Sequence, residues 1–240
     1  MRRAFTLVSV IVLGWAANAA ADPSELKGSY AFTGSAVCLV APGHFDDANP
    51  LPSNPNPGQL APFAGFNAKL QPNDIGASAQ QSFIRSFSVQ GIRTFDGHGH
   101  GHVKGTAVDV LGRPTPGPEG WPHFPPSASA ADFSFDFTYT VDGHGGWTSD
   151  MVSGTYTETF TAGPRGPQGG SPPAYPQTAT VDAIPRITGA ISNDGKTLVA
   201  SHVTPTVETH TYSNGDVWPE ICQRSRIFIK IGDADHGHLP

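Results

Sequence analysis

The sequence predicts an all-β chain folded as a single antiparallel barrel, or a barrel-like sandwich, of about nine or ten strands. The first observation is composition: the chain has 28 glycines and 23 prolines among 240 residues, and no stretch has a convincing helical period. The second is that short runs rich in Thr, Val, Ile, Phe and Tyr alternate between turn signals. The third is that the only two cysteines, Cys38 and Cys222, lie toward opposite ends of the chain.

The first 21 residues have the pattern of a secretory signal peptide. Arg2 and Arg3 form a basic start, an apolar stretch follows, and alanine-rich cleavage patterns end the segment. We therefore expect an exported protein, periplasmic or secreted, in which residues 22–232 form one domain and residues 233–240 a flexible tail.

Export makes the two cysteines informative, because a pair with no third cysteine indicates one disulfide in an oxidising compartment. Bonded cysteines have Cα atoms within about 7 Å of each other. The first strand, residues 29–40, and the last, residues 221–231, would then be neighbours in a closed barrel. If Cys38 faces Cys222 in antiparallel strands, the register sets Arg224 opposite Ala36, Arg226 opposite Gly34 and Phe228 opposite Phe32.

The strands between these two are predicted from alternation and turn residues. In chain order they are residues 82–95, 102–111, 132–141, 147–160, 178–184, 186–192, 196–203 and 206–212. A glycine-rich tip joins the first two as a hairpin, and Asn193-Asp194-Gly195 is a good hairpin turn.

Three long loops rich in proline and glycine interrupt the pattern, at residues 41–62, 112–129 and 162–177. Loops of this length in a compact domain are often functional. Trp121 and Phe124 in the second loop could cover a bound ligand, or could anchor the loop to the barrel.

Charge excludes some partners. The chain has 14 Lys and Arg, of which Arg2 and Arg3 leave with the signal peptide, so 12 remain against 20 Asp and Glu, a net charge of −8. This acidity disfavours nucleic acid and acidic membrane surfaces as partners. We expect no membrane span and no cofactor, and the oligomeric state stays open.

Gly28-Ser29-Tyr30 on the first strand, with an arginine such as Arg226 on the last, resembles the lipocalin (calycin) signature. Tyr30 stands where that family has tryptophan, and the family's late arginine packs on this ring across the closed end of the barrel. An allene-oxide-cyclase-like barrel fits equally well, and the chain is otherwise similar to secreted bacterial proteins of unassigned function. The resemblance implies a barrel and a small apolar ligand. We expect Tyr30, Phe32, Tyr212 and Arg226 to be among the residues that contact a ligand.

A polar face on the last two strands could carry catalysis. Pairing across the turn before the last strand would set Glu208 opposite Arg224 and His210 opposite Cys222. An inward face would make Glu208 a general acid or base, with His210 as its partner and Arg224 stabilising an oxyanion. An outward face would make the same residues a solvated ion pair. We favour the outward face, because the alternate positions of the last strand are Ile227, Ile229 and Ile231.

The run Gly97–His102 places three histidines, His98, His100 and His102, two residues apart. On an extended chain these imidazoles would point the same way and could bind zinc, copper or nickel. At a hairpin tip they would instead be solvated turn residues, which is the interpretation that we prefer.

These observations leave three functional hypotheses. The first is an exported β-barrel that binds a small apolar or amphipathic molecule. The second is a cofactor-free isomerase or cyclase that uses Glu208, His210 and Arg224. The third is a metal-binding or structural envelope protein.

Overall fold

The computed structural model describes residues 26–41, 65–72, 82–112, 127–162, 178–181, 184–212 and 217–233. They form eleven strands, which are β1 (Lys27–Val40), β2 (Phe83–Asp96), β3 (His100–Gly112), β4 (Ser127–Val141), β5 (Gly146–Met151), β6 (Thr157–Ala162), β7 (Thr178–Val181), β8 (Ile187–Ile191), β9 (Thr197–His202), β10 (Val207–Tyr212) and β11 (Val217–Gly232). This part of the chain contains no helix long and apolar enough to cross a membrane. The signal peptide predicted for residues 1–21 and the tail beyond Asp233 lie outside the described residues.

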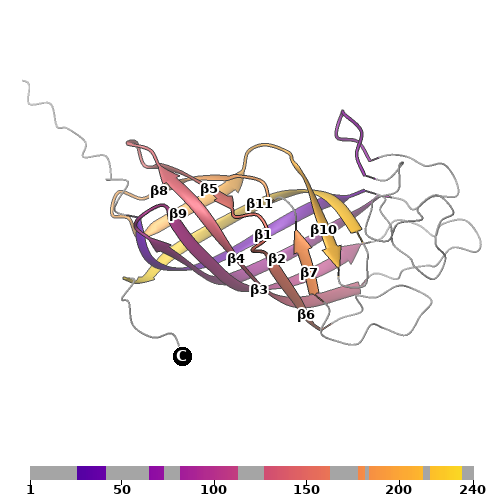
Figure 1. The fold of residues 1–240 in the computed structure, drawn as a ribbon, viewed down its shortest axis with the longest axis horizontal. Helices are drawn as coiled ribbons and strands as arrows, with labels where there is room; N and C mark the ends of the chain where they lie inside the picture. The colour runs from indigo at the N-terminus through magenta and orange to yellow at the C-terminus, as the bar shows by residue number, and fades with distance from the viewer. Residues whose placement is uncertain are drawn as a thin grey trace, which may run out of the picture.

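The strands close into an antiparallel barrel, as predicted, with β1 bonded to both β2 and β11 (Figure 1). Five strands run the length of the barrel: β1, β2, β3, β4 and β11. The other positions around the barrel are each occupied by two short strands. β5 and β6 pair with successive stretches of one edge of β4, and β9 and β10 do the same on β11. β8 pairs with both β5 and β9, and β7 pairs with both β6 and β10. The eleven strands therefore occupy eight positions around the barrel wall, in chain order.

The division of these positions into short strands corrects two expectations. The predicted strand 147–160 is two strands, because the chain turns at residues 152–156, where Val152 N donates to Asp136 O at 2.9 Å. The described residues therefore form eleven strands in place of the nine or ten predicted. Strand β4 also begins five residues earlier than predicted, at Ser127, and β11 begins four residues earlier, at Val217.

The two ends of the barrel differ. Short turns at residues 97–99, 142–145 and 192–196 join strands at one end, here called the turn end. Asp96 Oδ1 caps the first of these turns by accepting the backbone N–H groups of His98 and His100. All the longer connections, residues 42–81, 113–126 and 163–177, join strands at the opposite, loop-bearing end. Strands β6, β7 and β10 lie toward the loop-bearing end, and β5, β8 and β9 lie toward the turn end (Figure 1).

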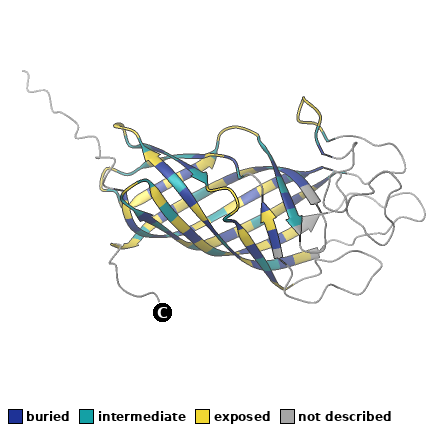
Figure 2. Ribbon diagram, viewed as in Figure 1, coloured by how far each residue is buried: buried dark blue, intermediate teal, exposed yellow. Residues whose placement is uncertain are grey.

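Along most of each strand the side chains alternate between the interior and the solvent (Figure 2). On β11 the inward positions include Cys222, Arg224 and Phe228, whereas Ile227 and Ile229 are 52% and 57% exposed. The expectation that the isoleucine side of the last strand faces inward is therefore wrong. β-Branched residues suit a strand on either face, and the larger aromatic and guanidinium side chains opposite them fill this narrow interior.

The interior changes character along the barrel. From the turn end to the middle it is an apolar core rich in aromatic rings, among them Tyr30, Phe95, Phe137, Trp147 and Phe228. Phe95 lies at the centre of this group, with four aromatic rings at centroid distances between 5.0 and 5.9 Å. Toward the loop-bearing end charged side chains occupy interior positions beside a second, smaller apolar cluster that includes Val40, Phe83 and Phe160, and these buried charges locate the candidate site.

Candidate functional site

The barrel closes where β1 meets β11, and this seam has the predicted register. Cys38 is opposite Cys222 and the two are bonded, with Cα atoms 4.0 Å apart. Arg224 lies opposite Ala36, Arg226 opposite Gly34 and Phe228 opposite Phe32. The disulfide prediction and the seam that it implied are both confirmed.

The pairing of β10 with β11 differs from the prediction. Glu208 lies opposite Glu220, and His210 opposite Trp218, because β11 begins earlier than predicted, at Val217. Glu208 and Arg224 nevertheless interact. Arg224 Nη2 donates to Glu208 Oε2 at 2.7 Å, and Arg224 Nη1 donates to Glu208 Oε1. The observed register differs from the predicted one by four residues, since Glu208 is opposite Glu220 and not Arg224. The long Arg224 side chain leans along β11 and still makes this bidentate pair.

These side chains face inward, so the outward interpretation that we favoured is wrong. Glu208, His210 and Arg224 are 0%, 3% and 5% exposed. They are in phase with Cys222 and Phe228 on β11, which fixes their face as the interior one. The three residues predicted for catalysis are therefore brought together inside the barrel.

A second arginine extends the group, which we call the ionised layer: Arg85, Asp109, Glu208, His210, Glu220 and Arg224. Arg85 Nε donates to Asp109 Oδ1 at 3.0 Å, and Arg85 Nη1 donates to Glu220 Oε2 at 3.0 Å. His210 Nε2 lies 2.9 Å from Glu220 Oε1 and 4.0 Å from Glu208 Oε2. The imidazole thus links the two arginine–carboxylate pairs into one buried network.

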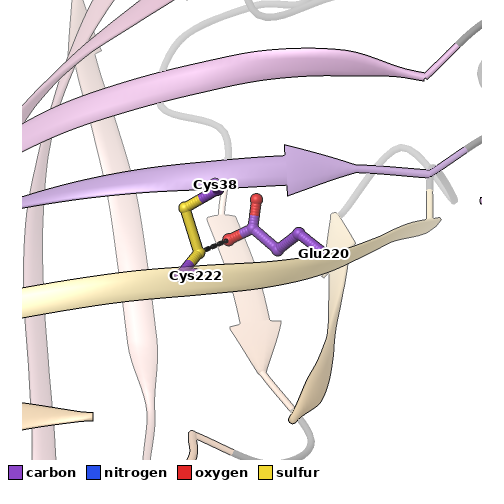
Figure 3. A group of neighbouring side chains, drawn as sticks. All are labelled: Cys38, Glu220 and Cys222. Carbon is purple, nitrogen blue, oxygen red and sulfur yellow. Dashed lines mark hydrogen bonds between the residues drawn. A yellow bond between two sulfur atoms is a disulfide. The ribbon is translucent and has the colours of Figure 1, made fainter. Parts of the chain in front are cut away.

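Glu220 also touches the disulfide. Its Oε1 atom lies 3.2 Å from Cys222 Sγ, the contact drawn in Figure 3. Because a disulfide sulfur carries no proton, this is a close oxygen–sulfur contact and not a hydrogen bond donated by a thiol. The Glu220 carboxylate therefore contacts three groups: the disulfide that closes the barrel, the Arg85 guanidinium and the His210 imidazole.

Electrostatics keep Glu220 and Arg224 charged near neutral pH. Burial by itself would raise the pKa of Glu220, but the charge of Arg85, with smaller contributions from His210 and Arg224, holds it well below its usual range. Burial would lower the pKa of Arg224, and the opposing charge of Glu208 raises it above the ordinary arginine value. Both groups are thus ionised, and a substrate or ligand in this layer would meet fixed charges.

His202 on β9 borders the layer, 3.4 Å from Arg224 Nη1 through its Nδ1 atom. Burial, reinforced by the charges of Arg224 and Arg226, lowers the pKa of His202 to about 3. The unfolded histidine has a pKa near 6.5, so between pH 6.5 and 3 the unfolded chain binds a proton that the folded chain does not. The free energy of unfolding should then fall as the pH falls through this window, by at most about 1.4 kcal/mol per pH unit.

Urea unfolding midpoints at pH 7 and pH 5 test this expectation. The difference between the two midpoints should shrink in His202→Gln and stay as in the parent protein for His102→Gln, whose side chain is 54% exposed. An equal difference in all three proteins would contradict the assignment to His202.

Two groups of described residues have ligand atoms close enough to hold a metal ion: Glu208, His210 and Glu220, and Cys38, Glu220 and Cys222. Neither suits a divalent cation as it stands. Glu208 and Glu220 already accept hydrogen bonds from Arg224 and Arg85, whose positive charges oppose a second cation. The cysteine sulfurs are joined to each other and are not thiolates.

Neither group contains the predicted metal ligands His98, His100 and His102. Gly97 and Gly99 have positive φ angles, which break the two-residue alternation that would align the three imidazoles. His102 Nδ1 instead lies 2.7 Å from Asp136 Oδ1 on the exposed face. The structure does not bring the three histidines together.

The predicted ligand-binding residues are dispersed. Tyr30 and Phe32 are buried in the apolar core, where the Tyr30 hydroxyl donates to Gly195 O at 2.8 Å. Arg226 lies over the Phe32 ring, 6.0 Å from its centroid, on the first strand as expected. Trp121, Phe124 and the side chain of Tyr212 lie outside the described residues.

Three members of the ionised layer were not predicted: Arg85, Asp109 and Glu220. The available signal for Arg85 was its phase on β2, since it alternates in step with the buried Phe83 and with Phe87. A charged residue at an inward position of a strand indicates a buried ion pair. Glu220 gave no such signal, because the expected last strand began one residue later, at Ile221.

No protein-family model matches the chain, and neither a curated protein nor a solved structure matches it. The function is therefore argued from the site.

Proposed function

We propose that the protein is an exported barrel that binds a small amphipathic molecule at its loop-bearing end, with the ionised layer as the floor of the site. One observation carries the proposal: the buried charged network lies at the end of the barrel where every long connection joins the strands. Loops held on a rigid scaffold are the usual place for binding residues.

The composition of the interior supports a polar floor in preference to an apolar cavity. Toward the turn end the inward positions are occupied by packed rings such as Phe95 and Trp147, which are 0% and 2% exposed. At the other end buried charged side chains lie beside rings such as Phe83 and Phe160, although apolar residues of similar size would commonly be as stable or more stable in their place. This stability cost supports a role in recognition.

A second candidate is a cofactor-free isomerase or cyclase. His210 lies between two carboxylates, and Arg224 is fixed beside one of them. In such an enzyme His210 would move a proton on the substrate, Glu208 and Glu220 would orient the imidazole, and Arg224 would stabilise developing negative charge.

Native mass spectrometry of protein purified from its own host tests the binding proposal. We expect a retained small molecule in the parent protein and loss of most of it in Arg85→Met, which removes a guanidinium from the floor. The control is Arg186→Met, which removes an exposed arginine that pairs with Asp150 at 2.9 Å. The proposal fails if no molecule is retained, or if both variants retain it equally.

The same molecule then separates binder from enzyme. If the protein is an enzyme, it converts the molecule, and His210→Gln slows this conversion by about 100-fold or more. The matched control is His102→Gln, since His102 also contacts a carboxylate but is exposed. An unconverted molecule, or an equal rate in both variants, would leave the binding function and exclude this catalytic role.

A further inference from the structure

Two histidines on the outer wall of the barrel, near its turn end, lie on the same face of one strand. His100 and His102 are the first and third residues of β3. Gly101 between them pairs with Phe95 on β2 and with Phe137 on β4, so the strand is regular at this point. Side chains two residues apart on a strand point the same way, and both histidines are exposed. The two imidazoles therefore project from the wall side by side.

The third histidine of the run does not belong to this pair. His98 lies in the turn before β3, between Gly97 and Gly99, whose φ angles are +82° and +95°. These left-handed conformations break the two-residue alternation before the strand begins. The fold thus separates His98 from the two histidines that share a face.

Asp136 orients the ring of His102. It is the direct cross-strand neighbour of His102 on β4, and its Oδ1 atom lies 2.7 Å from His102 Nδ1. Because a carboxylate accepts hydrogen bonds, Nδ1 carries the hydrogen and the neutral imidazole keeps a lone pair on Nε2. Histidines that bind metal ions commonly have this arrangement, in which the second ring nitrogen donates to a carboxylate.

The backbone of Asp136 is itself held in place by the turn at residues 152–156. Asp136 N donates to Thr155 Oγ1 at 3.0 Å, and Val152 N donates to Asp136 O at 2.9 Å. Thr155 Oγ1 donates in turn to Val152 O at 2.8 Å. The carboxylate that orients His102 is therefore positioned by the fold and not by a ligand.

A surface hollow of about 500 Å³, open to solvent, lies over these residues. Its lining includes His100 and His102 together with two acidic residues, Asp96 and Asp136. No lysine or arginine is among the described residues that line it. Negative charge without a compensating cation favours a bound cation. The ionised layer differs in this respect, because its carboxylates already accept hydrogen bonds from guanidinium groups.

We propose that His100 and His102 bind one divalent late transition-metal ion, with Asp136 as a positioning residue for His102. Residues i and i+2 of a strand are about 6.7 Å apart, and an ion about 2 Å from a nitrogen of each ring bridges two imidazoles that lean toward each other. Imidazole suits copper, zinc and nickel. The site is at the opposite end of the barrel from the ionised layer and does not depend on the function proposed there.

Cu²⁺ binding to the full chain, purified without an affinity tag, tests the proposal by calorimetry and electron paramagnetic resonance. We expect one tightly bound ion per chain, with magnetic coupling to two imidazole nitrogens. His102→Gln should weaken binding by about 100-fold, since a ligand is lost, and Asp136→Asn by about 10-fold. At saturating copper, Asp136→Asn should keep the coupling to two nitrogens, whereas His102→Gln should keep coupling to one.

Two controls use the other histidines of the chain. His98→Gln should leave the affinity for Cu²⁺ unchanged, because His98 lies in the turn. The tail His236-Gly237-His238 repeats the histidine spacing of β3 but lies outside the described residues. Replacing both tail histidines by glutamine should leave the tight site intact. An excess of Ca²⁺, which prefers oxygen ligands, should not displace Cu²⁺.

The substitutions are of exposed side chains, so the far-UV circular dichroism of every variant should match that of the parent. The proposal is overturned if the double variant His100→Gln, His102→Gln binds Cu²⁺ as tightly as the parent. It is also overturned if the tail variant or His98→Gln loses as much affinity as His102→Gln, or if Ca²⁺ displaces Cu²⁺. Loss of one coupled nitrogen in Asp136→Asn would contradict the positioning role of Asp136.

Discussion

Replacing both Cys38 and Cys222 by alanine should lower the free energy of unfolding by on the order of 5 kcal/mol. The bond spans 184 residues and joins the first and last strands at the seam that closes the barrel. Without it the unfolded chain regains the conformational freedom that the cross-link removes. Guanidinium chloride unfolding followed by circular dichroism measures the change.

The control uses another pair on the same two strands. Ser35 is directly opposite Ser225, and both side chains are exposed. Replacing this pair by alanine should change the free energy of unfolding by less than about 0.5 kcal/mol. Two free thiols in unreduced, denatured protein would contradict the bond itself, and equal midpoints for the two double variants would contradict its contribution to stability.

Glu208→Gln should destabilise the protein by about 3–5 kcal/mol, because it leaves the Arg224 charge buried without its carboxylate. Both members of this pair are almost wholly inaccessible to solvent, with side chains 6% and 0% exposed. The double variant Glu208→Leu, Arg224→Met removes both charges, so it should be more stable than Glu208→Gln alone. Urea unfolding of the singles and the double completes the cycle.

A surface pair with the same geometry provides the comparison. Arg186 donates to Asp150 through Nε at 2.9 Å and Nη2 at 2.9 Å, but these side chains are 65% and 44% exposed. Asp150→Asn should cost less than about 1 kcal/mol. If Glu208→Gln and Asp150→Asn had equal effects, burial would not govern the strength of the Glu208–Arg224 pair.

The ionised layer also illustrates how a register can be wrong while a contact is right. Glu208 and Arg224 were predicted to pair directly across β10 and β11, and the true partner of Glu208 on β11 is Glu220. The contact survives because inward residues of neighbouring strands converge inside a narrow barrel, and an arginine side chain spans several residues along its strand. Long side chains thus tolerate an error that short ones, such as cysteines, do not.

Several features of this protein follow from the sequence alone. Two-residue alternation along the segments between turn signals predicts the strands. Successive side chains of an extended backbone point to opposite faces, and this is a local property of the chain. The cysteine pair predicts the β1–β11 register residue by residue, since a disulfide permits only a short separation of two Cα atoms. Asp96 and the glycines after it, at the first hairpin tip, are likewise local turn signals.

Only the tertiary structure decided which face of each strand is inside. On β11 both faces are plausible by residue type, with Ile227 and Ile229 on one and Phe228, beside Arg226, on the other. Closure of the barrel resolves the choice: Arg224 faces inward because Arg85, Asp109, Glu208 and Glu220, from four strands, supply one connected network there. Such compensation depends on residues far apart in the chain, so no local pattern can reveal it.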